Sequence, residues 1–222
     1  MDIKEAIRER HSVRQYKTDP IAADVKALLE EYIEEANNDS GLRIQLVTED
    51  PECFNTLLSH YGRFRNVNNY LAIVGSKNLS NLDELGGYYG EKIVIEAQRL
   101  GLNTCWVAGT YGKGKCKANL QDDEKILCVI AIGYGENSGS QHKNKNLSKL
   151  CGVAEADMPV WFKDGIEAAL QAPTAVNQQK FFIDIDGDDA VIKAGRGALA
   201  RLDLGIVKYN FEAASGHKCK KR

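Results

Sequence analysis

Three short apolar segments constrain the fold most, because each has the length of a strand and no charge or proline interrupts its interior. They span residues 70–75, 102–107 and 125–135. The segments 70–75 and 125–135 are apolar runs of the kind that is typical of strands buried on both faces, and 102–107 is expected to be a further strand. Segments with apolar residues at helical spacing lie around and between them. The sequence therefore predicts an α+β fold in which helices flank a central sheet.

The same spacing predicts the other elements of secondary structure. Helices are expected at 2–10, 25–36, 52–59, 90–100, 159–170 and 199–213. A further strand is expected at 43–48, and a hairpin at 180–194 that turns at Asp186-Gly187.

Two comparisons within the chain indicate an internal duplication. Residues 90–101 and 205–216 have the same length and both end on glycine, and a helix, a polar break and a strand occur at 25–47 and again at 161–185. We expect an N-terminal half at 1–155 and a C-terminal half-repeat at 156–222, with a cleft between them. The alternative is that helices of similar length recur by chance.

Composition excludes several classes of function. The chain has 222 residues, and 29 Lys and Arg nearly balance 31 Asp and Glu, so we expect neither a nucleic-acid nor a membrane partner. The charged N-terminal segment lacks a signal peptide's apolar core. The six cysteines are scattered and the four histidines lack ligand spacing, so we expect no metal and no disulfides. These features favour a reduced, cytoplasmic protein.

Three polar or glycine-rich segments are candidates for a binding site. The segment RERHSVRQY places cations around a hydroxyl, a combination that matches phosphate oxygens, and an ordinary charged helix end is the alternative. The segment APTAVNQQ offers neutral amides that suit a heteroaromatic ring and a polyol, unless it is a simple capped loop. The segment CWVAGTYGKG follows a strand with small residues that let a ligand approach the backbone, unless it is a tight turn.

Taken together these segments resemble motifs of the nitroreductase family of flavoproteins, in the family's order over most of the chain. RHSVRQY resembles its N-terminal R-x-S-x-R/K motif, GLNTCWVAG its Gly-Leu-x-x-x-Trp segment, and VIAIGYG the strand that follows. KNKNLSKL is similar to its basic segment, and APTAVNQQKF to its A-P-S-x-x-N-x-Q-P-W motif. The resemblance implies a nitroreductase-like fold with a central mixed or antiparallel sheet.

The position of the amide motif departs from that of ordinary family members. There the motif follows the first long helix, but here that place holds ANNDSGLRIQLV and the motif lies near residue 172. This is similar to a rearranged branch of the family. In ordinary members the partner chain supplies the motif at a dimer interface, so the resemblance implies that the half-repeat supplies it in cis. Either a monomer or a homodimer is then expected. Lys180 stands where the family has proline.

The resemblance also implies tightly bound FMN, reduced by NAD(P)H and reoxidised by a nitro, quinone or similar small organic acceptor. No side chain is expected to be catalytic, because the flavin carries the chemistry. Two alternatives remain: a non-catalytic flavin-binding or apo sensor, and another flavin reaction such as dehalogenation, enone reduction or flavin reduction. The implied cofactor-binding residues are Arg10, His11, Ser12, Arg14, Ala108, Gly109, Lys143, Lys145, Pro173, Thr174, Asn177 and Gln179.

Overall fold

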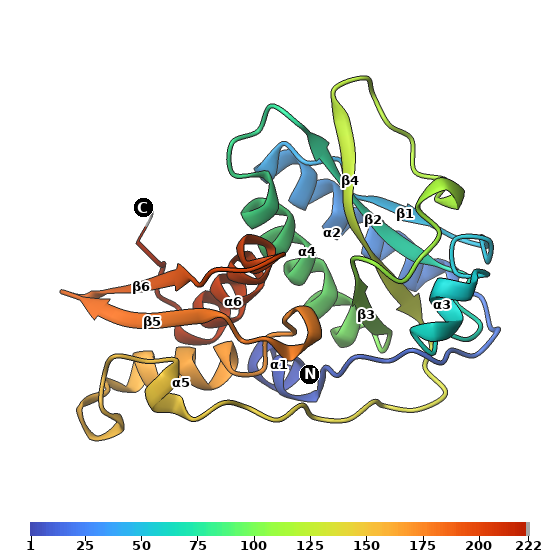
Figure 1. The fold of residues 1–222 in the computed structure, drawn as a ribbon. Coiled ribbons are helices and arrows are strands. Elements are labelled where there is room, and N and C mark those ends of the chain that lie inside the picture. The colour runs from blue at the N-terminus through green and yellow to red at the C-terminus, as the bar shows by residue number, and fades with distance from the viewer. Residues whose placement is uncertain (221–222) are drawn as a thin grey trace. The chain divides into compact units, whose positions relative to one another are not determined.

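The central sheet of the computed structural model, which describes residues 1–220, has four strands in the order β1-β2-β4-β3 (Figure 1). Each neighbouring pair is antiparallel, which confirms the expected sheet. The strands are β1 (Gln45–Val47), β2 (Tyr70–Ser76), β3 (Asn103–Val107) and β4 (Glu124–Gly133). The strands β2, β3 and β4 begin and end within two residues of the predicted segments, and β1 is shorter than the strand predicted at 43–48.

Both faces of this sheet are buried, which explains why β2 and β4 are apolar without alternation. On one face Tyr70, Ala72 and Val74 belong to a hydrophobic cluster with residues of β3 and β4. The residues that alternate with them, Leu71 and Ile73, are equally buried. The helix α2 (Ala23–Ser40) lies behind the sheet in Figure 1.

Each of the six predicted helices has a counterpart in the structure, although some begin elsewhere. Glu5 N donates to Asp2 Oδ1 over 2.8 Å, so Asp2 caps the first helix as its sequence position indicates. The helices other than α2 are α1 (Ile3–Glu9), α3 (Leu57–Tyr61), α4 (Leu82–Arg99), α5 (Val160–Ala169) and α6 (Ala200–Ser215). The predicted hairpin is formed by β5 (Phe181–Asp186) and β6 (Asp189–Ala194), with Asp186 opposite Asp189 across the turn.

Three details of the helix predictions are wrong. The helix α4 begins at Leu82 rather than residue 90. The helix α3 begins only at Leu57, because Thr56 caps it by accepting a hydrogen bond from Ser59 N over 3.2 Å. The apolar spacing of residues 25–36 also predicts that Leu28 faces the core, but it is 42% exposed.

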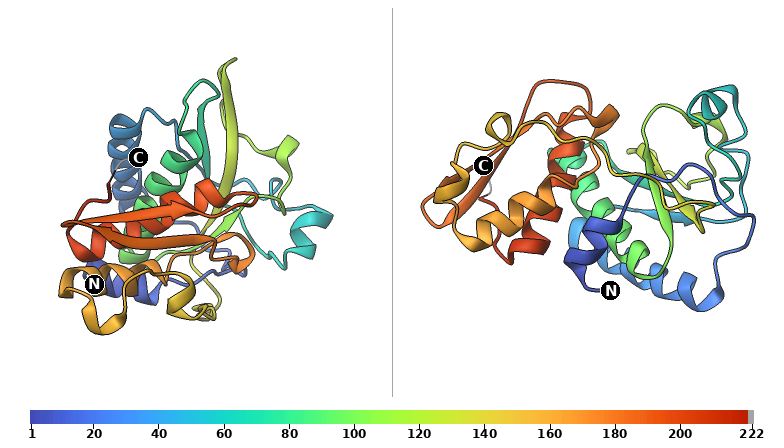
Figure 2. Two further views of the ribbon diagram at one scale, coloured as in Figure 1. Left: turned by 60° about the vertical axis from the view of Figure 1, so that its left-hand side comes forward. Right: turned by 90° about the horizontal axis from the view of Figure 1, so that it is seen from below.

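The described chain divides into two compact units. Unit 1 comprises residues 1–8, 83–91 and 142–222, and unit 2 comprises 9–82 and 92–141. In Figure 2 the segments of unit 1 include the α5, α6 and β5–β6 elements near the C-terminus, drawn in orange and red. This division by contact does not test the predicted halves 1–155 and 156–222, which stay a prediction.

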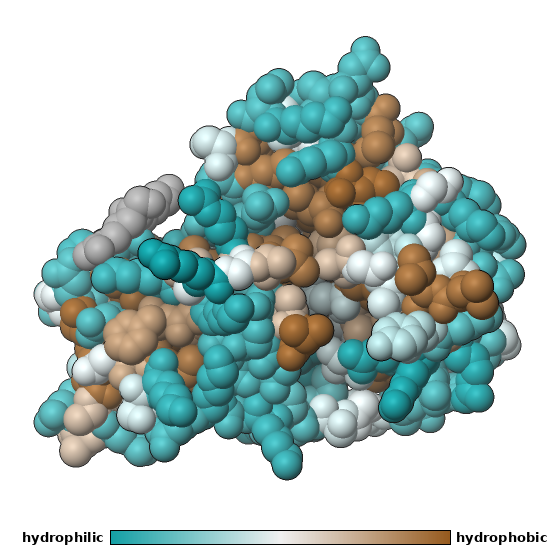
Figure 3. All heavy atoms as spheres, viewed as in Figure 1, coloured by the Kyte–Doolittle hydropathy of each residue, from teal (hydrophilic) through white to brown (hydrophobic). Residues whose placement is uncertain are grey.

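The surface is mainly polar on the face shown in Figure 3, with hydrophobic residues in separate patches. The large apolar side chains that are more than four-fifths exposed include Leu57, Tyr61 and Val176. Among the described residues, no helix combines the length and the apolar character needed to cross a membrane.

Candidate functional site

The predicted N-terminal group lies along the edge of the sheet in unit 2. Ser12 forms a parallel bridge with Thr104 of the edge strand β3, and Val13 N donates to Thr104 O over 3.0 Å. Arg10, just before this bridge, is only 3% exposed, whereas Arg14, just after it, is exposed. His11 packs against the backbone turn at Gly139. A Cβ atom added to Gly139 would lie only 2.8 Å from the Cβ atom of His11.

The thiol of Cys105 on β3 lies within the electrostatic influence of all three polar residues of this group. Burial raises the pKa of Cys105. The positive charge of Arg14, a hydrogen bond with Ser12 and the positive charge of Arg10 each oppose that rise. Two arginines and a hydroxyl therefore act on one position of the strand. A local cluster of this kind provides both charge and hydrogen-bond donors for an anion.

Ala108 and Gly109 directly follow the C-terminal end of β3, toward which the bridged segment runs. A Cβ added at Gly109 would meet no atom within 4 Å. The backbone there is open, so a flat group could approach the peptide N–H groups closely. Unit 2 thus brings Arg10, His11, Ser12, Arg14, Ala108 and Gly109 to one strand and its end.

The other predicted residues meet in unit 1, where the amide segment holds the basic segment. Gln179 is 3% exposed, and its Nε2 donates to Lys143 O over 2.8 Å and to Asn177 Oδ1 over 2.7 Å. Its Oε1 accepts from Lys145 N over 2.9 Å. The Lys145 ammonium in turn donates to the carbonyls of Gln178 and Gln179, over 2.6 and 3.2 Å. Segments some thirty residues apart in sequence are joined in this way.

Backbone strain is concentrated in the same loop, which follows Pro173 and Thr174. Val176, Asn177 and Gln179 all have positive φ, at 46°, 54° and 42°. For a β-branched residue such as Val176 this conformation is a genuine outlier, and strain of this kind costs roughly 1–3 kcal/mol per residue. Val176 is also 99% exposed, so no packing of its side chain offsets the cost.

Asp203 of α6 helps to hold this strained loop and was not among the predicted residues. Its Oδ1 accepts from Ala175 N over 3.0 Å and its Oδ2 from Gln178 Nε2 over 2.6 Å. Burial raises the pKa of Asp203, against these two hydrogen bonds. A signal existed in the sequence, because Leu199, Leu202, Ile206 and Tyr209 recur at helical spacing and Asp203 lies on the same face, four residues after Leu199.

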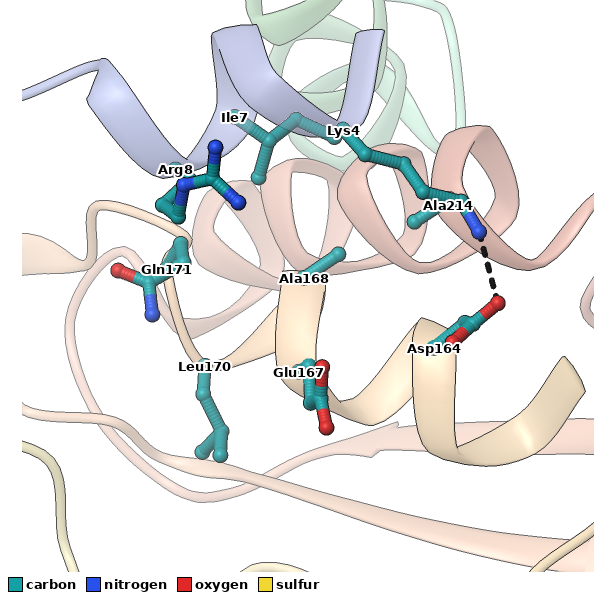
Figure 4. Close-up of a pocket in the computed structure, with 9 residues that line it drawn as sticks. All are labelled: Lys4, Ile7, Arg8, Asp164, Glu167, Ala168, Leu170, Gln171 and Ala214. Atoms are coloured by element: carbon teal, nitrogen blue, oxygen red, sulfur yellow. Dashed lines mark hydrogen bonds and ion pairs between the residues drawn. The ribbon is translucent and has the colours of Figure 1, made fainter. Parts of the chain in front are cut away.

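A separate hollow of about 400 Å³ in unit 1 contains none of the predicted residues. Figure 4 shows Lys4 and Arg8 extending from α1 toward α5, with Lys4 paired to Asp164 over 2.7 Å. The hollow is open and its charged residues lie on exposed helix faces. Its lining residues are Lys4, Ile7, Arg8, Asp164, Glu167, Ala168, Leu170, Gln171 and Ala214.

The predicted residues therefore form two groups, one in each unit. The residues of each group lie on neighbouring segments of one unit. The cleft predicted between the two groups stays a prediction. In the part of the chain that the structure describes, no set of three or more His, Cys, Asp or Glu side chains could hold a metal ion.

Comparisons with known proteins identify both a family and a fold. A family model described as "Putative TM nitroreductase" matches residues 2–215. Among solved structures, a putative nitroreductase from Thermotoga maritima has a TM-score of 0.70 at 19% identity, covering 100% of this chain and 90% of its own. A comparison with curated proteins found no match.

Two further solved structures match part of the chain. One is a putative nitroreductase from Desulfovibrio desulfuricans in complex with FMN, with a TM-score of 0.53 at 18% identity over 67% of this chain and 94% of that one. The other is a putative NADH dehydrogenase/NAD(P)H nitroreductase from Bacteroides thetaiotaomicron, also at 0.53 and 18%, over 67% of this chain and 95% of that one. At these identities they show a shared fold, and the expected nitroreductase-like fold is confirmed.

Proposed function

Because the chain belongs to the putative TM nitroreductase family, we propose that it is an FMN-dependent oxidoreductase. It takes two electrons from NAD(P)H and passes them to a nitro, quinone or similar small organic acceptor. The FMN complex of the Desulfovibrio protein and the NAD(P)H named for the Bacteroides protein support the choice of cofactor and reductant.

The observation that carries the proposal is the bridge between Ser12 and Thr104. It places Arg10 and Arg14 along a strand that ends at the open backbone of Gly109. FMN combines an anionic phosphate with a flat ring, so this arrangement of cations, hydroxyl and unobstructed backbone fits both of its parts.

Bound FMN would supply the hydride and electron transfer, and the chain's own residues would bind and orient it. Arg10, Ser12 and Arg14 would compensate its negative charge, and the backbone at Ala108 and Gly109 would face the ring.

In the amide loop, the two Nε2 hydrogens of Gln179 are already engaged, so its role would be to hold the backbone. The Thr174 hydroxyl accepts from Gln179 N over 3.0 Å and keeps its own hydrogen for a ligand. Asn177 Nδ2 donates to Lys143 O over 2.9 Å and keeps a second hydrogen. These two side chains would thus make the direct contacts from this loop, while Lys143, Lys145 and Pro173 shape it.

An absorption spectrum of the purified protein, recorded before and after anaerobic addition of NADH or NADPH, tests the proposal. Flavin bands that bleach are the expected result. Bands that persist with both nucleotides would indicate a flavin-binding protein without this reductase activity. A colourless protein that FMN cannot reconstitute would contradict the proposal altogether.

A further inference from the structure

Two cysteines from distant parts of unit 2 share one corner of its hydrophobic cluster. Cys53 lies in the turn before α3, and Cys116 follows the short 3₁₀ turn Lys113–Lys115. Both pack in the cluster that surrounds Tyr70, with Cys53 fully buried and Cys116 partly exposed. Gly112 N donates to Cys53 O over 2.8 Å, which fixes the loop that carries Cys116 onto Cys53.

A buried polar network holds the loop in this position. The Tyr70 hydroxyl donates to Asp50 Oδ2 over 2.7 Å and accepts from Lys117 N over 2.9 Å. The Lys117 ammonium pairs with Asp50 Oδ1 over 3.0 Å, and Asp50 is only 1% exposed. The residue next to Cys116 is therefore tied to the cluster through both its backbone and its side chain.

The two thiols differ in reactivity because they interact with each other. The Cys53 thiol hydrogen-bonds to the Cys116 sulfur, which lowers the pKa of Cys116, and a hydrogen bond from the Ala118 backbone adds to the effect. The same contact, together with burial, raises the pKa of Cys53. Elsewhere in the chain, burial raises the pKa of Cys105, Cys151 and Cys219. The thiolate is the reactive form of cysteine, so a partly exposed thiol whose pKa is lowered is the more reactive of the two.

We propose that Cys116 is a site of oxidation by small peroxides and that Cys53 is its resolving thiol. The Cys116 thiolate attacks one oxygen of the peroxide and becomes a sulfenic acid, while the other oxygen leaves as water or an alcohol. The Cys53 thiol then attacks the sulfenic sulfur, the S–O bond breaks, and water leaves as the disulfide forms. The pair thereby loses two electrons to the peroxide, and an external dithiol returns them.

The test uses the reduced protein, in which all six cysteines are free thiols. One equivalent of hydrogen peroxide is added, the remaining thiols are blocked with N-ethylmaleimide, and the peptides are identified by mass spectrometry. We expect a Cys53–Cys116 disulfide, the loss of two titratable thiols and their recovery with dithiothreitol. Alkylation of the untreated protein should be at least about tenfold faster at Cys116 than at Cys105, Cys151 or Cys219.

Two variants separate the roles of the thiols. Cys53→Ser should leave the sulfenic acid on Cys116 to be trapped by dimedone, and Cys116→Ser should leave Cys53 reduced. Circular dichroism checks that each variant is folded. The wild-type protein alone can overturn the proposal: Cys116 alkylation as slow as that of the buried cysteines, or oxidation without a Cys53–Cys116 disulfide, would do so. Neither result bears on flavin binding.

Discussion

Gly87 of α4 and Gly205 of α6 meet each other's helices with the same geometry. A Cβ at Gly87 would lie 2.0 Å from Leu202 O, and a Cβ at Gly205 would lie 2.0 Å from Glu84 O. In each case the carbonyl belongs to the residue three positions before the opposite glycine. The two backbones are therefore in direct contact within unit 1, and the contact relates Gly87 to Gly205. The sequence comparison instead aligned Gly90 with Gly205, a difference of three residues.

Substitution of either glycine by alanine should destabilise the protein. In an ordinary helix interior, Gly→Ala stabilises by roughly 1 kcal/mol. Here the added methyl group would force the helices apart, which costs about 1–3 kcal/mol as other overpacked cores do. Urea unfolding of Gly87→Ala and Gly205→Ala measures the loss. Gly114→Ala is the control, because open space surrounds that position. Stability equal to that of the wild type in both variants would show that the helices do not touch.

Substitution of Asn210 on α6 should stabilise the protein, unlike substitution of the two glycines. It is 0% exposed, and neither Nδ2 nor Oδ1 has a hydrogen-bond partner. Burial of an unsatisfied amide is costly, so Asn210→Leu should stabilise the protein by about 1–3 kcal/mol. Asn37 is the matched control, because its amide accepts from Ile44 N over 2.7 Å and donates to Ile44 O over 3.0 Å. Asn37→Leu should destabilise. Thermal unfolding of both variants measures the contrast, and a loss of stability in both would contradict it.

Val176→Asn should relieve strain in the amide loop. Asparagine tolerates positive φ better than valine, and the exposed Val176 side chain has no packing to lose. We expect a gain of about 1 kcal/mol in the free energy of unfolding. Val160→Asn, at an exposed position with ordinary helical geometry, should show no such gain. A chemical denaturation series would refute the prediction if the two variants changed equally.

Asp203 should make stability depend on pH. Its pKa is raised in the folded protein, so the folded state binds the proton more tightly than the unfolded state. The stabilisation of the protonated form is complete at low pH and is lost as pH rises from about 4 through the raised pKa. The stability of wild type relative to Asp203→Asn should therefore fall over this range. Urea midpoints at several pH values measure the difference, with the exposed Asp188→Asn as control. A relative stability that rises with pH would have the wrong sign.

Arg14→Ala should weaken FMN binding about tenfold or more without unfolding the chain. The exposed guanidinium contributes charge beside Ser12, and a charged hydrogen bond contributes about 1.5–3 kcal/mol. Arg10→Ala combined with Arg14→Ala should release the flavin. The double variant Lys113→Ala/Lys125→Ala removes as much positive charge as the double arginine variant, from exposed positions of unit 2. It should retain the flavin. Fluorescence titration with FMN gives the dissociation constants, and equal values for Arg14→Ala and the lysine control would contradict the assignment.

Strands were easier to predict from the sequence than the ends of helices. The apolar segments 70–75 and 125–135 have the length and composition that favour buried strands, and β2 and β4 form there. The start of α4 was missed because Gly87 reads as a helix breaker in isolation. Its role is visible only when α6 lies against it, and that contact joins residues more than a hundred positions apart.

The candidate site was predictable only in part, for the same physical reason. Local residue chemistry predicts that Arg10, Ser12 and Arg14 bind an anion, which stays a prediction, and the structure places all three beside β3. It also identified the amides of Asn177 and Gln179, but not that they would be engaged with Lys143 and Lys145. Hydrogen bonds between distant segments decide which amide hydrogens remain available to a ligand.

The path of the chain limits how this protein can be divided. It passes from one unit to the other after residues 8, 82, 91 and 141, and the single helix α4 contributes residues to both. No uninterrupted piece of the gene therefore encodes either unit. A truncation, or a crossover between related genes, at one point between residues 9 and 141 would divide both units at once. We expect that such fragments recover a folded state only when the missing piece is supplied as a second polypeptide.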